Sequence, residues 1–299
     1  LPDPATQGTL HAEFTPGTSA GKAWVVLRYG IAVADSFAFT TRSGGPQAIS
    51  MQAMRQELSA VGTGGVDNTT LVATVRDANG NPTPPTWVYF YMEYFPGMEN
   101  PSAIRPLINF SDGQEPTNPY GVPFDSARTN SGIALVSVTA GSELGNIRIK
   151  SWAYRDESRQ DSVQATFTGL RVMAGPPHDI SVDVNDMGID GGGAIWNVEV
   201  SARIVDILNN PVKDSLSVQF ETSPNWATIG YQAWTGNTDL SGESTPGVAY
   251  TIMSYNSQNT NDTVSITVEV LPENGEPLSV TFDEINLPIQ SPGGGLYGD

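Results

Sequence analysis

The sequence lacks cysteine altogether, and it has only two histidines, His11 and His178, in 299 residues. Without a thiol there can be no disulfide bond, cysteine nucleophile, zinc finger or iron–sulfur centre. The two histidines lie far apart along the chain, and nothing around either one indicates a base held beside a nucleophile. We therefore expect no catalytic site and a protein that is not an enzyme.

The sequence is also poor in positive charge and in long apolar runs. Lys and Arg number 14 against 32 Asp and Glu, which gives a formal net charge of −18. A surface of this sign repels nucleic acid and anionic lipid. No apolar run approaches the ~18 residues that a membrane-spanning helix needs. We expect neither a nucleic-acid partner nor a membrane span, and the lack of a signal-peptide pattern at Leu1 predicts a mature or trimmed chain.

Short alternating segments separated by turns are abundant. Gly (31) and Pro (22) are frequent, and apolar residues make up 38% of the chain, enough for packed cores. Residues 71–76 alternate with the period of a half-buried strand. The turn DANGNP follows at 77–82, and an aromatic, β-branched segment follows at 87–91. Asn-Gly tolerates the backbone of a tight turn, so this stretch predicts a hairpin within an all-β fold.

The order of these motifs resembles that of bacterial immunoglobulin-like group 1 domains, the tandem repeats of the invasin and intimin adhesins. The resemblance covers residues 47–153, from QAISMQAMRQELSAVGTGGVDNTTLVATVRDANGNP to SGIALVSVTAGSELGNIRIKSWA. It implies tandem immunoglobulin-like antiparallel β-sandwiches and a bacterial extracellular or cell-surface location. The family has no catalytic residues to transfer, and a shared fold does not identify a ligand.

Extending the pattern divides the chain into modules. Residues 46–173 form the central repeat, with Met51 to Ala60 as a kinked first strand and a long irregular insertion at 93–130. Residues 174–286 carry a related turn, DILNNP, between alternating segments, which predicts a complete but divergent repeat. Residues 287–299 form a tail.

Residues 1–45 contain only the C-terminal half of a repeat. The alternating segments around Gly17 and Gly21 match those around Gly141 and Gly145, but the front half is missing. So few strands cannot bury both faces of a sandwich, and their unpaired edges invite pairing. The chain is then a fragment of a longer repeat protein, or another subunit completes the half by strand addition, or the strands pack on this chain's next domain. The candidate assembly residues, two of them in the tail, are Leu10, Phe14, Trp24, Val26, Leu287 and Ile289.

Two further groups are candidates for ligand contact. Trp226, Tyr231 and Trp234 lie in a segment rich in Gly and Asn, where exposed aromatic rings can stack on a sugar. Oxygen-bearing side chains cluster around Gly188, which predicts a weak calcium site. Its candidate ligands are Asp183, Asn185, Asp186 and Asp190. The tryptophans of the strand segments, Trp87, Trp152 and Trp196, are expected in the cores.

The sequence therefore predicts a non-catalytic extracellular structural protein. It would be a subunit of a surface filament or adhesin stalk, assembled by β-strand complementation through the incomplete first repeat. Its partners would be other copies of itself or neighbouring repeats of a longer chain. The alternative is a carbohydrate-binding or spacer module of a larger secreted bacterial enzyme, with a glycan as partner. No cofactor is expected apart from calcium.

Overall fold

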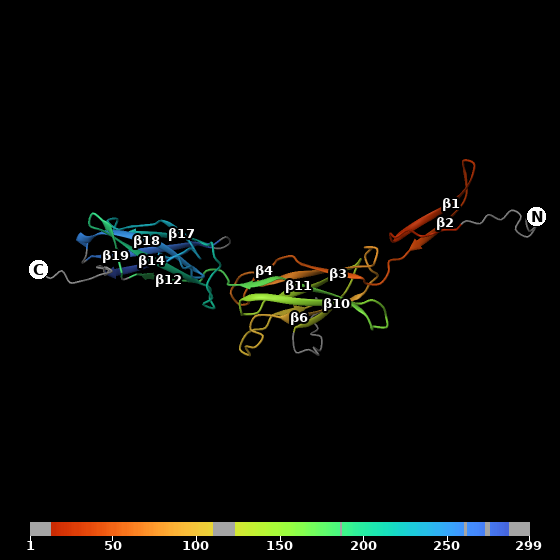
Figure 1. Ribbon diagram of the computed structural model, residues 1–299, viewed down its shortest axis with the longest axis horizontal. Helices are drawn as coiled ribbons and strands as arrows, with labels where there is room; N and C mark the ends of the chain where they lie inside the picture. The colour runs from red at the N-terminus through yellow and green to blue at the C-terminus, as the bar shows by residue number, and fades with distance from the viewer. Residues whose placement is uncertain (1–12, 110–122, 186, 260–261, 273–275, 287–299) are drawn as a thin grey trace, which may run out of the picture.

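The computed structural model describes residues 13–109, 123–185, 187–259, 262–272 and 276–286. Within these residues the chain forms twenty strands and one short 3-10 helix, η2 (Ser257–Asn259), with no α-helix. The strands make a hairpin and two sandwiches that follow one another along the long axis (Figure 1). The predicted all-β class is confirmed.

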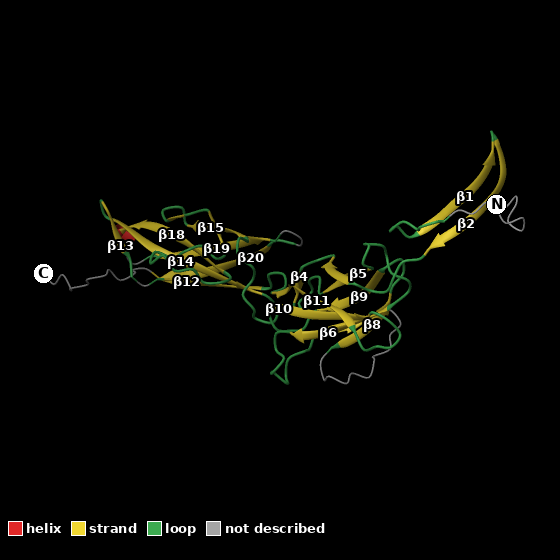
Figure 2. Cartoon of the chain, turned by 45° about the vertical axis from the view of Figure 1, so that its right-hand side comes forward, coloured by secondary structure: helices red, strands yellow, loops and turns green. Residues whose placement is uncertain are grey.

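The N-terminal body is an antiparallel hairpin of β1 (Gly21–Tyr29) and β2 (Ala32–Thr41). Its register starts with Gly21 opposite Thr41. Gly30 in the connecting turn has a φ of +59°, which glycine adopts without strain. Among the described residues these two strands pair only with each other (Figure 2). The first module is thus incomplete within the described chain, as the sequence predicts.

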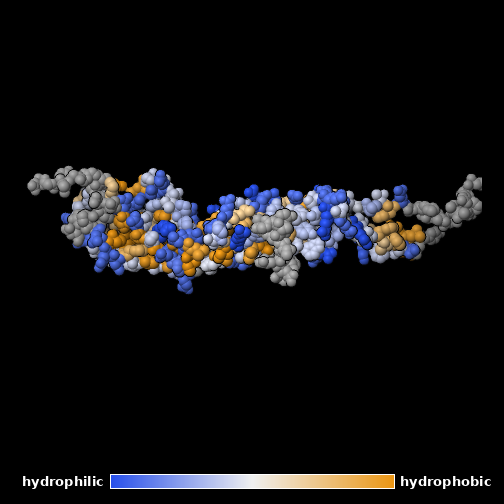
Figure 3. All heavy atoms as spheres, turned by 90° about the horizontal axis from the view of Figure 1, so that it is seen from below, coloured by the Kyte–Doolittle hydropathy of each residue, from blue (hydrophilic) through white to orange (hydrophobic). Residues whose placement is uncertain are grey.

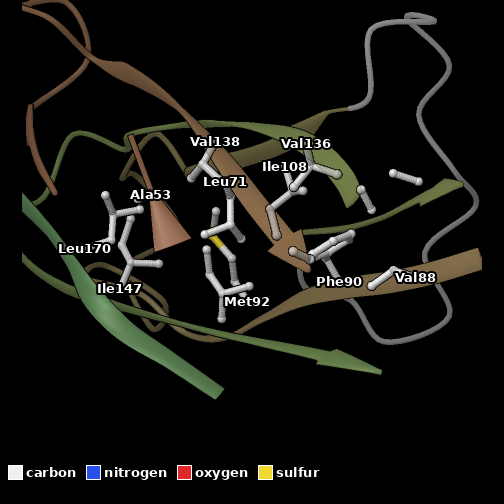
Figure 4. Close-up of a cluster of buried hydrophobic side chains, with 14 of the residues drawn as sticks. Ala53, Leu71, Val88, Phe90, Met92, Ile108, Val136, Val138, Ile147 and Leu170 are labelled. Atoms are coloured by element: carbon white, nitrogen blue, oxygen red, sulfur yellow. The ribbon is translucent and has the colours of Figure 1, made fainter. Parts of the chain in front are cut away.

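The first sandwich packs a four-stranded sheet against a five-stranded one. The alternating residues of each strand give it a buried inner face, where Leu71, Phe90 and Met92 point toward Val136 and Ile147 (Figure 4). Full burial of such side chains contributes roughly 1.5–3 kcal/mol each. One sheet has the order β3 (Ala48–Ala53), β5 (Asn68–Arg76), β9 (Ile133–Thr139), β7 (Leu107–Asn109). The other has the order β4 (Glu57–Ser59), β11 (Ser162–Met173), β10 (Gly145–Tyr154), β6 (Trp87–Tyr94), β8 (Phe124–Arg128).

The second sandwich repeats this plan around a separate core. Val200, Ile204, Phe220 and Ile266 are among its fully buried residues. One sheet has the order β12 (Asp179–Val184), β14 (Ile195–Val205), β18 (Val248–Asn256), β16 (Thr228–Ile229), with β13 (Ile189–Gly192) also on β14. The other has the order β17 (Gln232–Trp234), β15 (Ser217–Ser223), β19 (Thr263–Leu271), β20 (Leu278–Asn286).

The kinked first strand of the central repeat is confirmed. β3 pairs antiparallel with β5 in one sheet, whereas β4 pairs parallel with β11 in the other. The chain therefore changes sheets between Ala53 and Glu57, which ties the two sheets together at their edges.

Two predicted details are wrong. The turn at 77–82 joins β5 to β6, but these strands lie in different sheets, so it is no hairpin. Both strands bury one face in the same core, and a connection across the sandwich achieves this as readily as a hairpin does. The segment 93–130 is not only an insertion, because it supplies β7 to one sheet and β8 to the other. These strands are short, and β8 (FDSAR) is too polar for its alternation to stand out.

Candidate functional site

One face of the hairpin is mostly apolar and uncovered. Val25 lies opposite Phe37, and Ala23 opposite Phe39. Phe14, from the segment before β1, stacks on Phe39 with ring centroids 4.7 Å apart. Phe37 meets Phe39 edge-on at 4.8 Å, yet Phe37 remains 64% exposed. We call this surface the inner hairpin face; it comprises Phe14, Ala23, Val25, Leu27, Phe37 and Phe39, with Asp35 opposite Leu27.

The inner hairpin face corresponds to a core face of the first sandwich. The first three cross-strand pairs of β1–β2 have the same register as those of β10–β11, so Ala23 and Phe39 take the places of Ile147 and Leu170. Ile147 and Leu170 are fully buried beneath the second sheet of their sandwich. The hairpin is thus built like the last two strands of a sandwich, without the opposing sheet among the described residues.

The predicted assembly residues divide between the two hairpin faces. Phe14 belongs to the inner face, but Trp24 and Val26 alternate onto the opposite face, where they are 63% and 41% exposed. The remaining three, Leu10, Leu287 and Ile289, lie outside the described residues.

Both edges of the hairpin are also open within the described chain. In the first sandwich the outer edge of β10 pairs antiparallel with β6, and that of β11 pairs parallel with β4. The matching edges of β1 and β2 have no such partner strand among the described residues. Each edge therefore offers a row of backbone donors and acceptors to an incoming strand.

The segment before each sandwich is tied to that sandwich by a carboxylate. Asp77 accepts hydrogen bonds at Oδ1 from the amides of Asn79 and Asn81, both at 2.9 Å, and at Oδ2 from the amide of Gly44 at 2.9 Å. The Gly44 amide, with the Asn81 side chain and the other amides, lowers the pKa of Asp77 from 3.8 to about 2. The carboxylate therefore stays charged at neutral pH and holds the linker at Gly44.

Asp206 makes the same set of contacts in the second sandwich. Its Oδ1 accepts from the amides of Leu208 and Asn210 at 2.9 Å, and its Oδ2 accepts from the amide of Gly175 at 2.9 Å. Gly175 also lies against Thr63 of the first sandwich so closely that a Cβ there would come within 2.2 Å of the Thr63 Cβ. The linker between the sandwiches is therefore held from both sides. We call the Asp77–Gly44 and Asp206–Gly175 contacts the linker clamps.

Asn81 adds a direct contact between the hairpin body and the first sandwich. Its Nδ2 donates to the carbonyl of Thr18 at 2.8 Å, and its Oδ1 accepts from the amide of Ala20 at 3.1 Å. This bidentate contact is just ahead of β1, so the hairpin is anchored at the turn of the next module.

The predicted sugar-contact residues lie in the second sandwich but differ in exposure. Tyr231 and Trp234 are 55% and 51% exposed, and the Tyr231 hydroxyl donates to Gln219 Oε1 at 2.8 Å. Trp226 instead packs against the core of the second sandwich. Only two of the three rings are therefore exposed, and sugar contact at this segment stays a prediction.

The predicted calcium ligands are spread over two strands and their loop. Asp183 is in β12 and Asp190 in β13, while Asp186 lies outside the described residues. Asn185 Oδ1 accepts from the amide of Met187, and Asp190 Oδ1 from that of Gly192, so both oxygens serve local turns. Within the described ranges no three His, Cys, Asp or Glu side chains are grouped to hold a metal ion. Calcium binding stays a prediction.

One surface is missed by the sequence reasoning. Trp87 and Trp152, expected in the core, lie on the outer face of the five-stranded sheet, because Val88 and Phe90 take the inner positions of β6. Trp152 is half-buried among other outward rings, and Tyr89 stacks on it at 5.1 Å. Both parities of WVYFYMEY are apolar, so alternation alone does not show which side faces the core. We call this surface the aromatic array; it comprises Tyr89, Tyr91, Phe124, Trp152 and Tyr154.

These observations place the chain among proteins built from immunoglobulin-like β-sandwiches in series. No protein-family model matches the chain, and no curated protein matches it in sequence. Among solved structures it is similar to FdeC, an Escherichia coli adhesin, with a TM-score of 0.50 and 15% identity over 88% of this chain and 74% of that one. This likeness supports the fold. No helix in the described part of the chain has the length and apolarity to cross a membrane.

Proposed function

We propose that the chain is a section of a bacterial surface stalk or filament, a non-catalytic extracellular protein built of tandem modules. In this proposal another copy of the chain supplies the strands that complete the hairpin body. The observation that carries it is the inner hairpin face, where Val25, Leu27 and Phe37 are exposed. Ala23 and Phe39, the counterparts of fully buried core residues, are only partly buried there.

The geometry of the hairpin specifies what would complete it. By analogy with β10–β11, an incoming strand pairs antiparallel along β1, and a second one pairs parallel along β2. A sheet laid over the inner hairpin face would bury Val25, Leu27 and Phe37, each worth roughly 1.5–3 kcal/mol when fully buried. Backbone pairing supplies binding strength, and the apolar face sets the register.

The linker clamps support a tandem arrangement. Asp77 and Asp206 accept from matching sets of three amides, two in their own turn and one from the glycine that precedes their sandwich. Both the incomplete body and the first sandwich therefore end in a hairpin, and in each case a clamped linker follows it. This is the relation expected between successive repeats of one stalk.

The test compares substitutions on the two hairpin faces. Val25→Ser with Phe37→Ser disrupts the inner hairpin face, and Trp24→Ser with Val26→Ser is the matched control on the opposite face. Negative-stain electron microscopy and sedimentation velocity of the full chain should show polymers for the wild type and the control, and monomers for the inner-face variant. Deletion of residues 1–41 should leave 46–290 folded and abolish polymers.

Polymers that survive the inner-face substitutions or the deletion would contradict strand complementation through this body. A wild-type chain that remains monomeric at high micromolar concentration would contradict assembly between copies.

A further inference from the structure

We propose that the aromatic array is a binding site for an oligosaccharide. This inference is independent of the assembly proposal, because the array lies on the first sandwich and shares no residue with the hairpin. Three strands supply its rings. Tyr89 is nearly parallel to Trp152 at 5.1 Å and to Phe124 at 6.3 Å, and Tyr154 meets Tyr89 edge-on at 5.9 Å. The rings form one continuous surface that faces away from the core.

The fold does not require these rings. β15 and β19 of the second sandwich occupy the places of β6 and β10, and β15 carries the same buried Val-x-Phe pair as β6. Where Tyr89 pairs with Trp152 in the first sandwich, Gln219 pairs with Glu269 in the second. The second sandwich still closes a complete core. Cross-strand aromatic pairs do stabilise sheets, but the counterpart shows that polar pairs suffice here.

Two hollows flank the array and share one ring. The first has a volume of about 270 Å³ and lies between Tyr91, Trp152 and Tyr154. The second has a volume of about 320 Å³ and is lined by Tyr154 together with Trp87 and Tyr89. Adjacent hollows near the lower end of the ~300–1,000 Å³ range of ligand sites suit successive units of a chain rather than one compact molecule.

Polar side chains interleave with the rings, which favours a sugar over an apolar or protein ligand. Gln164 lies opposite Trp152, Ser162 opposite Tyr154, and Lys150 opposite Tyr91 in the sheet register. A pyranose has an apolar face that stacks on an aromatic ring and hydroxyl groups around its rim that need donors and acceptors. The array offers both at neighbouring positions. Lys150 and Arg148 both pair with Glu93, whose carboxylate offsets one of their two positive charges.

The test uses two matched double variants of the full chain. Tyr89→Gln with Trp152→Gln alters the array, and Tyr231→Gln with Trp234→Gln alters the exposed pair of the second sandwich. Neutral and acidic oligosaccharides, with cellohexaose, chitohexaose and a hyaluronan hexasaccharide among them, are first screened on a microarray. The probes that bind are then measured by isothermal titration calorimetry. Wild type and control should bind alike, and the array variant at least about tenfold more weakly, as for loss of aromatic hot-spot residues.

Three results would overturn the proposal: no binding of any oligosaccharide by the wild type, equal binding by the array variant, or loss only in the Tyr231/Trp234 variant. Sedimentation is measured in parallel, and a dimer that the array substitutions dissociate would assign the array to a protein contact instead. If circular dichroism shows that the array variant is unfolded, Ser162→Ala with Gln164→Ala tests the rim while leaving the rings in place. The same loss of affinity is expected there, and unchanged affinity would contradict the site.

Discussion

Asp77 shows what a residue's own neighbourhood in sequence reveals and what it leaves hidden. The motif DANGNP identifies a turn. The Asp77 contacts to Asn79 and Asn81 are expected there, because the side chain of Asp in a turn accepts hydrogen bonds from the backbone amides that follow it. The third contact, to the amide of Gly44, joins residues 33 positions apart. A turn motif carries no information about that partner, so the linker clamps appear only in the structure.

The pH dependence of stability should report the Asp77 clamp. The folded-state pKa of Asp77 is about 2, below its ordinary value of 3.8, so its contribution is complete above about pH 4 and is lost as the pH falls through about 2. Asp77→Asn should therefore lower the melting temperature by a constant amount between about pH 5 and about pH 8, the range in which the carboxylate is fully charged. The difference from wild type should shrink below about pH 4. Calorimetry at stepped pH would measure it, and an equal difference at pH 2 and pH 7 would contradict the role of the charge.

The candidate sites were only partly predictable at the residue scale. Tyr231 and Trp234 are exposed, whereas Trp226 packs on the core and Trp152 faces outward. In a strand that is apolar on both sides, sequence does not show which side the opposing sheet covers. The aromatic array could have been suspected only from the unusual content of β6, five aromatic residues in WVYFYMEY.

At the scale of elements, alternation predicted the long strands well and the short ones poorly. β5, β9 and β19 follow the expected pattern of buried and exposed residues. β7 and β16 have three and two residues, too few for a period to be recognised. Sheet membership was harder still, because β5 and β6 are joined by a turn suited to a hairpin and yet lie in opposite sheets.

A core substitution in one sandwich should destabilise that sandwich and not the other. Phe90 and Phe220 hold corresponding places, are almost completely buried, and belong to clusters with no residue in common. Phe90→Ala should destabilise the first sandwich by about 3–5 kcal/mol and leave the second unchanged, and Phe220→Ala should do the reverse. Hydrogen exchange resolved by peptide would check this, with each variant as the other's control. Equal loss of protection in both sandwiches from either substitution would contradict independent cores.

At the scale of the whole molecule, the linkers decide how the modules follow one another. The linker between the sandwiches is in contact with both, through Asp206 on one side and Thr63 on the other. The run AGPP at 174–177 restricts the backbone of this linker. It does not give the direction of the second sandwich, because the contacts that set this direction come from loops remote in sequence.

Gly175 should be the sensitive position of this linker. A Cβ at Gly175 would come within 2.2 Å of the Thr63 Cβ, whereas at Gly44 the nearest atom, the Asp77 Cβ, is 3.6 Å away. Gly175→Ala should change the small-angle X-ray scattering profile at low angle without melting either core, and Gly44→Ala should leave it unchanged. Identical profiles for both variants and the wild type would show that the contact does not orient the sandwiches.

The hydrogen bonds of the Asn81 side chain to Thr18 and Ala20 have a consequence for any fibre made from this chain. Because these hydrogen bonds fix the hairpin to the turn of the first sandwich, that sandwich sets the orientation of the hairpin about the long axis. In the proposed polymer, each added subunit would then be rotated by the same angle relative to the last. The side chain of Asn81 would thereby determine the pitch of the filament.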